Sequence, residues 1–444
     1  MKVMSEAWHH DWLVQCLAAV PEQNQVVPPH PVVAHDEADW AALIRLAERH
    51  DVVPLLYHQL HQAGRGWGVT ERVRGELRQA FLVNGARNAL HYHELAPVLR
   101  ALRTAGIPCL VLKGAHLAAL VYSQPALRTM ADIDLLVPVD ALLPAGAVLR
   151  SLGYADAEDS TCGAVDETVM HLPRMFKPPG LGIEVHHTIS RPQLPFCVDV
   201  EGLWQRARTV ELAGESTQVL SPEDVLLYLC LHTASHARES QGLDLAPFLL
   251  GLKPLCDIVA MVRRHGPDLD WAAVRERATA WRAGRCVFLS LWLAQDLLGL
   301  EVPASVLESL RPADFADDWA ELARKQIRLA GTEAPDADVL RTTFAPWMEW
   351  DKRRHTGERR GWLGVLFRAL IPSRDQVDRR VTGAGPATAA PGQVSSYFFT
   401  RTWRWSVRIA RMTGYALRHP WQTARYVRHI RNQMRLWNWL EDQR

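Results

Sequence analysis

Hydrophobic positions in the first part of the chain recur at helical spacing. Between residues 36 and 105, apolar side chains such as Leu43, Ala47 and Leu56 fall near a 3.6-residue period. The pattern stops at residues 106–108, a Gly-Ile-Pro sequence that is typical of a helix end. We therefore predict a helical N-terminal segment over residues 1–105.

Short apolar runs bounded by Gly and Pro come next. The runs at residues 109–112, 133–137 and 183–187 each indicate a buried strand. Residues 114–122 and 141–152 have the spacing of short helices between them. This alternation predicts a mixed α/β unit with a small mixed sheet over residues 106–205.

Helical periodicity returns after this unit. Ser221-Pro222-Glu223-Asp224 is typical of a helix start, because Ser caps a first turn and Pro suits the first helical position. We predict a helical domain over residues 206–381. Residues 382–396 are small, uncharged and contain Gly and Pro, as in a linker, and a helical extension follows over residues 397–444. The predicted fold class is thus α/β (α+β), with helical segments around a small sheet.

Composition narrows the class of protein. The chain is 48% hydrophobic and 22% charged with a net charge of +1, which fits a globular protein and not a general polyanion binder. None of the seven Cys residues forms a CxxC pair, so we expect buried thiols and neither a disulfide framework nor structural zinc. The N-terminus lacks the pattern of a signal peptide, and the expected location is cytoplasmic.

Candidate chemistry begins with Asp132 and Asp134. On a strand, positions i and i+2 point to the same face, so two carboxylates would share a small volume. Such a pair is costly to bury unless a cation lies between the charges, and Mg²⁺ prefers oxygen ligands of this kind. Upstream, Lys113-Gly114 stands where a strand turns into a helix, and a Gly there lets the backbone approach a phosphate.

These residues resemble the DNA polymerase β-like nucleotidyltransferase superfamily, and above all its bacterial family of uncharacterised nucleotidyltransferases. The resemblance covers roughly residues 35–300. The matching segments are Leu112-Lys113-Gly114, Tyr122, Arg128, the run from Asp132 to Val137, and Ile183-Glu184-Val185-His186. Ala115 departs from the wider superfamily, which often has Ser or a second Gly at that position.

The resemblance implies a Mg²⁺-dependent transfer of a nucleoside monophosphate from an NTP to an acceptor hydroxyl or phosphate. Asp132, Asp134 and Glu184 would be the catalytic and metal-binding carboxylates for two Mg²⁺ ions. Glu184 would also help to deprotonate the acceptor, an unidentified small molecule or peptide. The nucleotide would be bound by Lys113, Gly114, Arg128 and His186.

Several of these residues could instead have purely structural roles. Arg128 could instead hold an Asp, His186 could be a structural strand histidine, and Tyr122 could belong to the core. His171 precedes the third strand as a further polar candidate. His232 and His236 are spaced i, i+4 on a helix, which suits either packing or a site-facing role, with Asp257 as a potential partner.

The last 44 residues contain ten Arg, no Lys and five Trp. Three interpretations compete: helices that dock on the catalytic domain with their Arg side chains facing water, an amphipathic pair on anionic lipid at the inner membrane face, or a nucleic-acid contact. Two function classes stay open as alternatives to the nucleotidyltransferase that the resemblance implies. One is a nucleic-acid-directed transferase, and the other is a non-catalytic nucleotide-binding or interaction protein.

Overall fold

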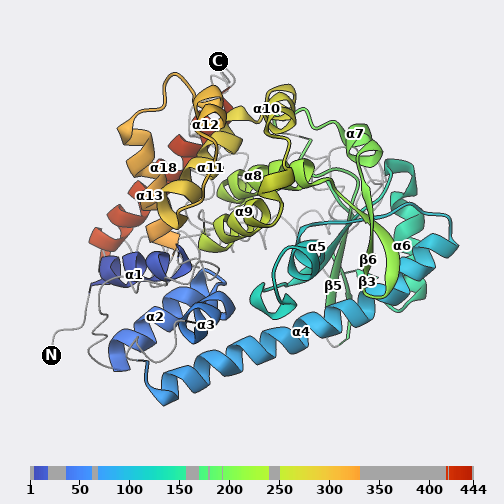
Figure 1. Cartoon of the computed structure of the whole chain (residues 1–444), viewed down its shortest axis with the longest axis horizontal. Coiled ribbons are helices and arrows are strands. Elements are labelled where there is room, and N and C mark those ends of the chain that lie inside the picture. Colours follow the sequence, from blue (N-terminus) through green and yellow to red (C-terminus); the bar gives the residue numbers. More distant parts are fainter. Residues whose placement is uncertain are drawn as a thin grey trace, which may run out of the picture.

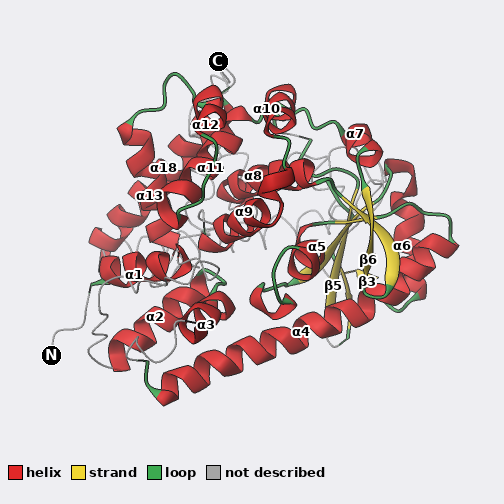
Figure 2. Cartoon of the chain, viewed as in Figure 1, coloured by secondary structure: helices red, strands yellow, loops and turns green. Residues whose placement is uncertain are grey.

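A seven-stranded sheet lies at one end of the molecule, and helices fill the other end (Figures 1 and 2). We describe the protein from a computed structural model. The described residues are 5–18, 37–62, 69–156, 170–178, 181–192, 194–239, 251–330, 417–418 and 420–442. The mixed α/β fold class predicted from the sequence is confirmed.

The sheet is mixed, with strand order β3-β4-β5-β2-β1-β7-β6. Its central strand β2 pairs in parallel with β5 and antiparallel with β1, which is itself parallel to β7. The outer pairs are antiparallel. The strands are β1 (Leu110–Val111), β2 (Asp132–Leu136), β3 (Ala155–Asp156), β4 (Met175–Lys177), β5 (Leu181–His186), β6 (Arg208–Leu212) and β7 (Glu215–Val219).

The two faces of the sheet have different environments. Ile133 and Leu135 of β2 belong to a core that is completed by side chains of α4 (Glu71–Thr104), α5 (Lys113–Leu120) and α6 (Leu142–Ser151). Because side chains alternate along a strand, Asp132 and Asp134 point to the other face. The acidic pair is therefore presented on one side of the sheet, as predicted.

The N-terminal segment is helical in its described parts. It contains α1 (Glu6–Ala18), α2 (Glu37–Arg49), α3 (Val53–Gln62) and α4, which runs along the molecule from these helices to the sheet (Figure 1). Gly106 ends α4 with a φ of 70°, a left-handed conformation that Gly adopts without strain, while the Ile107 amide donates to the Leu102 carbonyl. The predicted helix end is confirmed.

The second half is helical after the β6–β7 hairpin. The short helix α7 (Val200–Gln205) precedes the hairpin, and the described helices after it are α8 (Pro222–Glu239), α9 (Leu252–His265), α10 (Trp271–Ala280), α11 (Gly284–Leu298), α12 (Ala304–Leu310), α13 (Asp317–Ala330) and α18 (Pro420–Glu441). The Ser221 hydroxyl accepts a hydrogen bond from the Asp224 amide, which confirms the predicted cap of α8.

Helix α18 docks on the helical part of the protein. Leu436, Trp437, Trp439 and Leu440 are buried, and the Trp439 ring stacks on that of Trp319 in α13. The end of the extension therefore docks on helices outside the predicted catalytic core, and docking on that core stays a prediction. Contact with lipid or nucleic acid stays a prediction, and residues 382–416 lie outside the described part of the chain.

The domain division also stays a prediction, although the sheet does not stop at the expected boundary. The β6–β7 hairpin joins the sheet beside β1, so the sheet continues to Val219, past residue 205. Of the described Cys residues, Cys16, Cys230, Cys256 and Cys286 are buried free thiols, whereas Cys197 is exposed. None of the described helices combines the length and the apolar character that a membrane crossing requires.

Candidate active site

Three carboxylates meet where β2 and β5 run side by side. In the parallel register Asp134 lies opposite Glu184, and Asp132 lies opposite Gly182. Asp134 is almost fully buried, whereas the side chains of Asp132 and Glu184 retain 26% and 20% of their exposure. The strand period of two thus brings together the carboxylates that the sequence singled out.

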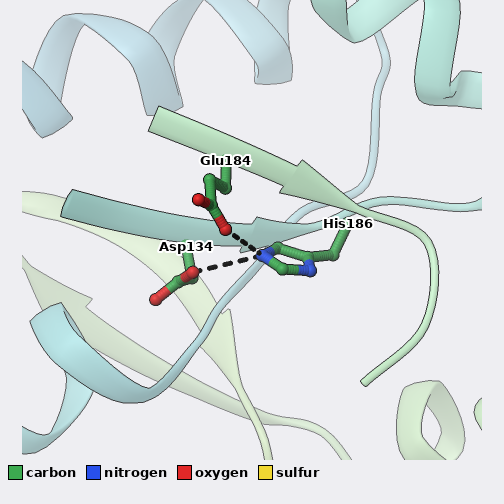
Figure 3. A group of neighbouring side chains, drawn as sticks. All are labelled: Asp134, Glu184 and His186. Carbon is green, nitrogen blue, oxygen red and sulfur yellow. Dashed lines mark hydrogen bonds and ion pairs between the residues drawn. The ribbon is translucent and has the colours of Figure 1, made fainter. Parts of the chain in front are cut away.

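His186, two residues beyond Glu184, joins this group (Figure 3). Its Nε2 lies 3.1 Å from Asp134 Oδ1 and 3.4 Å from Glu184 Oε2. A carboxylate accepts hydrogen bonds, so Nε2 carries the proton and donates. The imidazole is fully buried beside the carboxylates. Its predicted contact with the nucleotide is untested, and its observed partners are the two acids.

Lys113 begins α5 directly beside the acidic group. Its Nζ lies 3.7 Å from Asp134 Oδ1 and 5.8 Å from the centre of the Tyr228 ring on α8. Gly114 follows in the first turn, where an added Cβ would lie 3.5 Å from the Asp132 carbonyl oxygen. That is an ordinary contact, so packing alone does not require Gly here, and its predicted role at a phosphate remains a prediction.

Electrostatics hold most of this group in its charged form. Burial by itself would raise the pKa of Asp134, but the Lys113 charge and the His186 hydrogen bond lower it well below its usual range. Burial would likewise lower the pKa of His186, yet the hydrogen bonds to Asp134 and Glu184 raise it. Burial followed by the neighbouring charge of Asp134 raises the pKa of Asp132 to about 6.

Arg174, which the sequence reasoning did not single out, lies on the same group. Its Nη2 is 2.9 Å from Asp132 Oδ2 and donates to the Ala131 carbonyl at 3.0 Å, while its Nε is 4.0 Å from Glu184 Oε1. Arg174 stands just before β4, a three-residue strand without a recognisable sequence pattern. The available signal was a basic residue ten positions before Glu184.

The guanidinium of Arg128 is bonded to a carboxylate of the protein, whereas nucleotide binding would require it to face a phosphate. Its guanidinium donates from Nε and Nη2 to the two carboxylate oxygens of Asp257 on α9, both at 2.9 Å. The Tyr122 hydroxyl donates to the same carboxylate at 2.8 Å. Arg128 is 7% exposed. The structure thus places it in the alternative role of holding an Asp, and its nucleotide contact is untested.

The remaining histidines divide between the site and its surroundings. The His171 ring lies 4.9 Å from that of His186, and residue 171 forms an isolated bridge to residue 186. Burial, with the charge of His186, lowers the pKa of His171. His232 lies near Tyr228 on α8, and the side chain of His236 is outside the described part of the chain.

The donor set fits a divalent cation. One oxygen each of Asp134 and Glu184 and one nitrogen of His186 lie within 4.8 Å of one another, and Asp132 stands beside them. Carboxylates suit Mg²⁺ and Mn²⁺, and the imidazole would favour the transition metal only by giving up the Nε2 proton that it donates to the two acids. Asp134 and Glu184 are thus brought together as expected, and His186 replaces Asp132 in the tightest grouping.

Comparison with known proteins gives the family. The sequence profile of the family described as uncharacterised nucleotidyltransferase matches residues 36–299. A solved structure of an antigenic nucleotidyltransferase-like protein from Paracoccidioides brasiliensis is 16% identical, with a TM-score of 0.27 over 51% of this chain and 95% of that one. No curated protein matches significantly. Since the profile covers more than half of the chain and includes the acidic strand pair, this protein belongs to the uncharacterised nucleotidyltransferase family.

Proposed function

We propose that the protein transfers a nucleoside monophosphate from an NTP to an acceptor hydroxyl or phosphate, with Mg²⁺ or Mn²⁺ as cofactor. One observation carries this proposal. Donor atoms of Asp134, Glu184 and His186 converge beside Asp132 in a chain of the nucleotidyltransferase family. Carboxylates gathered at this density are the usual means by which proteins hold a cation against phosphates.

In the proposed reaction the acceptor oxygen attacks the α-phosphorus. A new O–P bond forms, the bond between the α-phosphorus and the bridging oxygen breaks, and pyrophosphate leaves. A bound divalent cation neutralises the charge on the phosphate oxygens. Asp132, Asp134 and Glu184 would hold it, while His186 keeps Asp134 and Glu184 in place through Nε2.

The basic residues and Glu184 complete the assignment. Lys113, at the start of α5 and 3.7 Å from Asp134, supplies positive charge where the triphosphate would lie. Burial by itself would raise the pKa of Glu184, but the hydrogen bond from His186 lowers it below the usual value. This carboxylate is therefore ionised at neutral pH. Glu184 is therefore available to receive the proton of the acceptor hydroxyl.

Calorimetry with ATP, GTP, CTP and UTP, each with Mg²⁺ or with EDTA, tests the site. We expect at least one nucleotide to bind only with the metal and to lose binding at least tenfold in Asp134→Asn. Asp156→Asn is the matched control, because Asp156 lies in the same sheet and pairs with Arg150 near the surface. Equal binding by wild type and Asp134→Asn would refute the metal-site assignment.

Isotope labelling separates the reaction classes. With α-³²P NTP the label should pass to the acceptor fraction and pyrophosphate should accumulate. Transfer from γ-³²P NTP instead would identify a phosphotransferase. If nucleotide binds but neither label moves with any acceptor extract, the non-catalytic nucleotide-binding alternative is favoured. Addition of RNA or DNA to the same assay tests the nucleic-acid-directed alternative.

A further inference from the structure

Arg174 reaches across one strand to touch another. Strand β4 pairs antiparallel with β5 so that Met175 lies opposite Ile183, which brings residue 174 next to Glu184. From there the guanidinium extends to Asp132 on β2, with 2.9 Å between Nη2 and Oδ2. The guanidinium of Arg174 therefore already neutralises Asp132, and a metal cation that binds the same carboxylate must compete with it.

The chain leaves room for this guanidinium at Gly182. A Cβ built at Gly182 would lie 2.6 Å from Arg174 Nε and 3.0 Å from its Nη2, closer than such contacts occur. Gly182 is the residue of β5 that lies opposite Asp132, so the guanidinium lies over bare backbone beside that carboxylate. The Phe176 ring supports it, with Cζ 5.2 Å from the ring centre.

The hold on Arg174 is incomplete. Its Nε is shielded from solvent yet has no hydrogen-bond partner among the described residues, and it remains 4.0 Å from Glu184 Oε1. The side chain as a whole is 32% exposed. An unsatisfied buried donor costs free energy, so this position is not the best one available once other acceptors arrive.

We propose that Arg174 is an exchangeable counter-ion of the active site. The proposal rests on the function proposed above. Before metal binds, the guanidinium neutralises Asp132; when metal and nucleotide bind, Asp132 turns to the cation and Arg174 pairs with the phosphates. Two cations on one carboxylate repel each other, whereas a guanidinium matches phosphate oxygens in a two-bond geometry.

An exchange of this kind has opposite effects on two affinities. Without the guanidinium, Mn²⁺ alone should bind roughly tenfold more tightly, since a competing charge within about 4 Å is removed. Tripolyphosphate with Mn²⁺ should bind at least tenfold more weakly, since its partner is lost. A purely structural Arg174 would weaken both, and a residue that only contacts phosphate would leave Mn²⁺ binding unchanged.

Calorimetry on the full chain measures both affinities, with Mn²⁺ alone and with inorganic tripolyphosphate at saturating Mn²⁺. Arg174→Gln should show the two opposite changes. Arg174→Lys, which keeps the charge, should bind Mn²⁺ like the wild type. Gly182→Ala displaces the guanidinium without altering its charge and should tighten Mn²⁺ binding as Arg174→Gln does. Arg150→Gln is the control, because Arg150 pairs with Asp156 away from the acidic group.

The outcomes distinguish the two proposals. If wild type binds Mn²⁺ and Asp134→Asn does not, the metal site stands. Should Arg174→Gln then bind Mn²⁺ no more tightly than wild type, the exchange is refuted alone. Absence of Mn²⁺ binding to the wild type would overturn the metal site and the exchange together. Circular dichroism and thermal unfolding of each variant verify that it is folded.

Discussion

At the scale of single residues, the pair of Arg128 and Asp257 joins the sheet region to the helical part of the chain. Both side chains are less than 10% exposed, and Tyr122 completes the coordination of the carboxylate. Burial opposes the charge on Arg128, but Asp257 more than restores it and raises the pKa of the guanidinium. Removing one partner of a buried pair leaves the other charge without compensation.

We expect Asp257→Ala to lower the free energy of unfolding by about 3–5 kcal/mol, because it leaves the buried charge of Arg128 without a partner carboxylate. Tyr122→Phe should cost about 1 kcal/mol, the net worth of one hydrogen bond. Urea unfolding measures both. The ion pair of Arg150 and Asp156, which lies near the surface, is the control. Asp156→Ala should lower the free energy of unfolding by less than about 1 kcal/mol. Similar losses for Asp257→Ala and Asp156→Ala would contradict the buried-pair account.

At the scale of elements, α4 positions the loop that precedes the acidic strand. The Asn88 side-chain amide donates to the carbonyls of Pro125 and Arg128 at 2.6 and 2.8 Å, and that of Asn84 donates to Ala126. These amides give the loop carbonyls side-chain donors, in addition to the Arg128 amide that donates to Pro125 and the Asn84 amide that also donates to Arg128. The long helix thus fixes the backbone from which Arg128 and then β2 emerge.

Asn88→Ala should lower the free energy of unfolding by roughly 1–3 kcal/mol, because the carbonyls of Pro125 and Arg128 each lose one of their two donors. It should also weaken Mg²⁺-dependent nucleotide binding, since the loop leads into Asp132. Val83→Ala is a control on the same helix; Val83 is 53% exposed, and we expect almost no change in either measurement. Unaltered stability in Asn88→Ala would argue against this role of α4.

At the scale of the whole molecule, folding buries two histidines that cannot readily take up a proton, His50 after α2 and His116 in α5. Burial, together with the charges of His10 and Arg49, lowers the pKa of His50 to about 3. Burial lowers the pKa of His116 in α5 to about 4. In the unfolded chain each titrates near 6.5. Folding therefore favours the neutral form, and stability is lost as the pH falls below 6.5 toward these lower values.

We predict that each such histidine lowers the free energy of unfolding by about 1.4 kcal/mol between pH 7.5 and pH 5.5. The raised pKa values of Asp132 and His186 act in the opposite direction, so the contribution of one histidine is read from a variant. His50→Gln should reduce this loss, because one titrating group is removed. His93→Gln should not, since His93 is exposed. Unfolding in urea at the two pH values measures the difference. Equal losses of stability in the wild type and in His50→Gln would show that His50 titrates normally in the folded protein.

The periodicity of the sequence was sufficient to predict which side chains share a face, wherever one face of a helix or strand is buried and the other is not. The i, i+2 spacing in β2 predicted that Asp132 and Asp134 share a face, because a strand's period of two depends on backbone geometry alone. Glu184 was expected only from the family resemblance, and the pairing of β5 with β2 places it opposite Asp134. The end of α4 at Gly106 was predictable for the same reason, since a positive φ there is a local requirement. The family resemblance added the chemistry.

Tertiary structure decided what depends on residues distant in the chain. Strands β3 and β4 are too short to carry a pattern, and β6 and β7 are rich in polar residues, so none was predicted. Arg174 reaches Asp132 only because β4 and β5 pair and Gly182 has no side chain. Arg128 is held by an Asp 129 positions away, on α9. A sequence determines which residues can carry charge or cap a helix, whereas packing determines which charges meet.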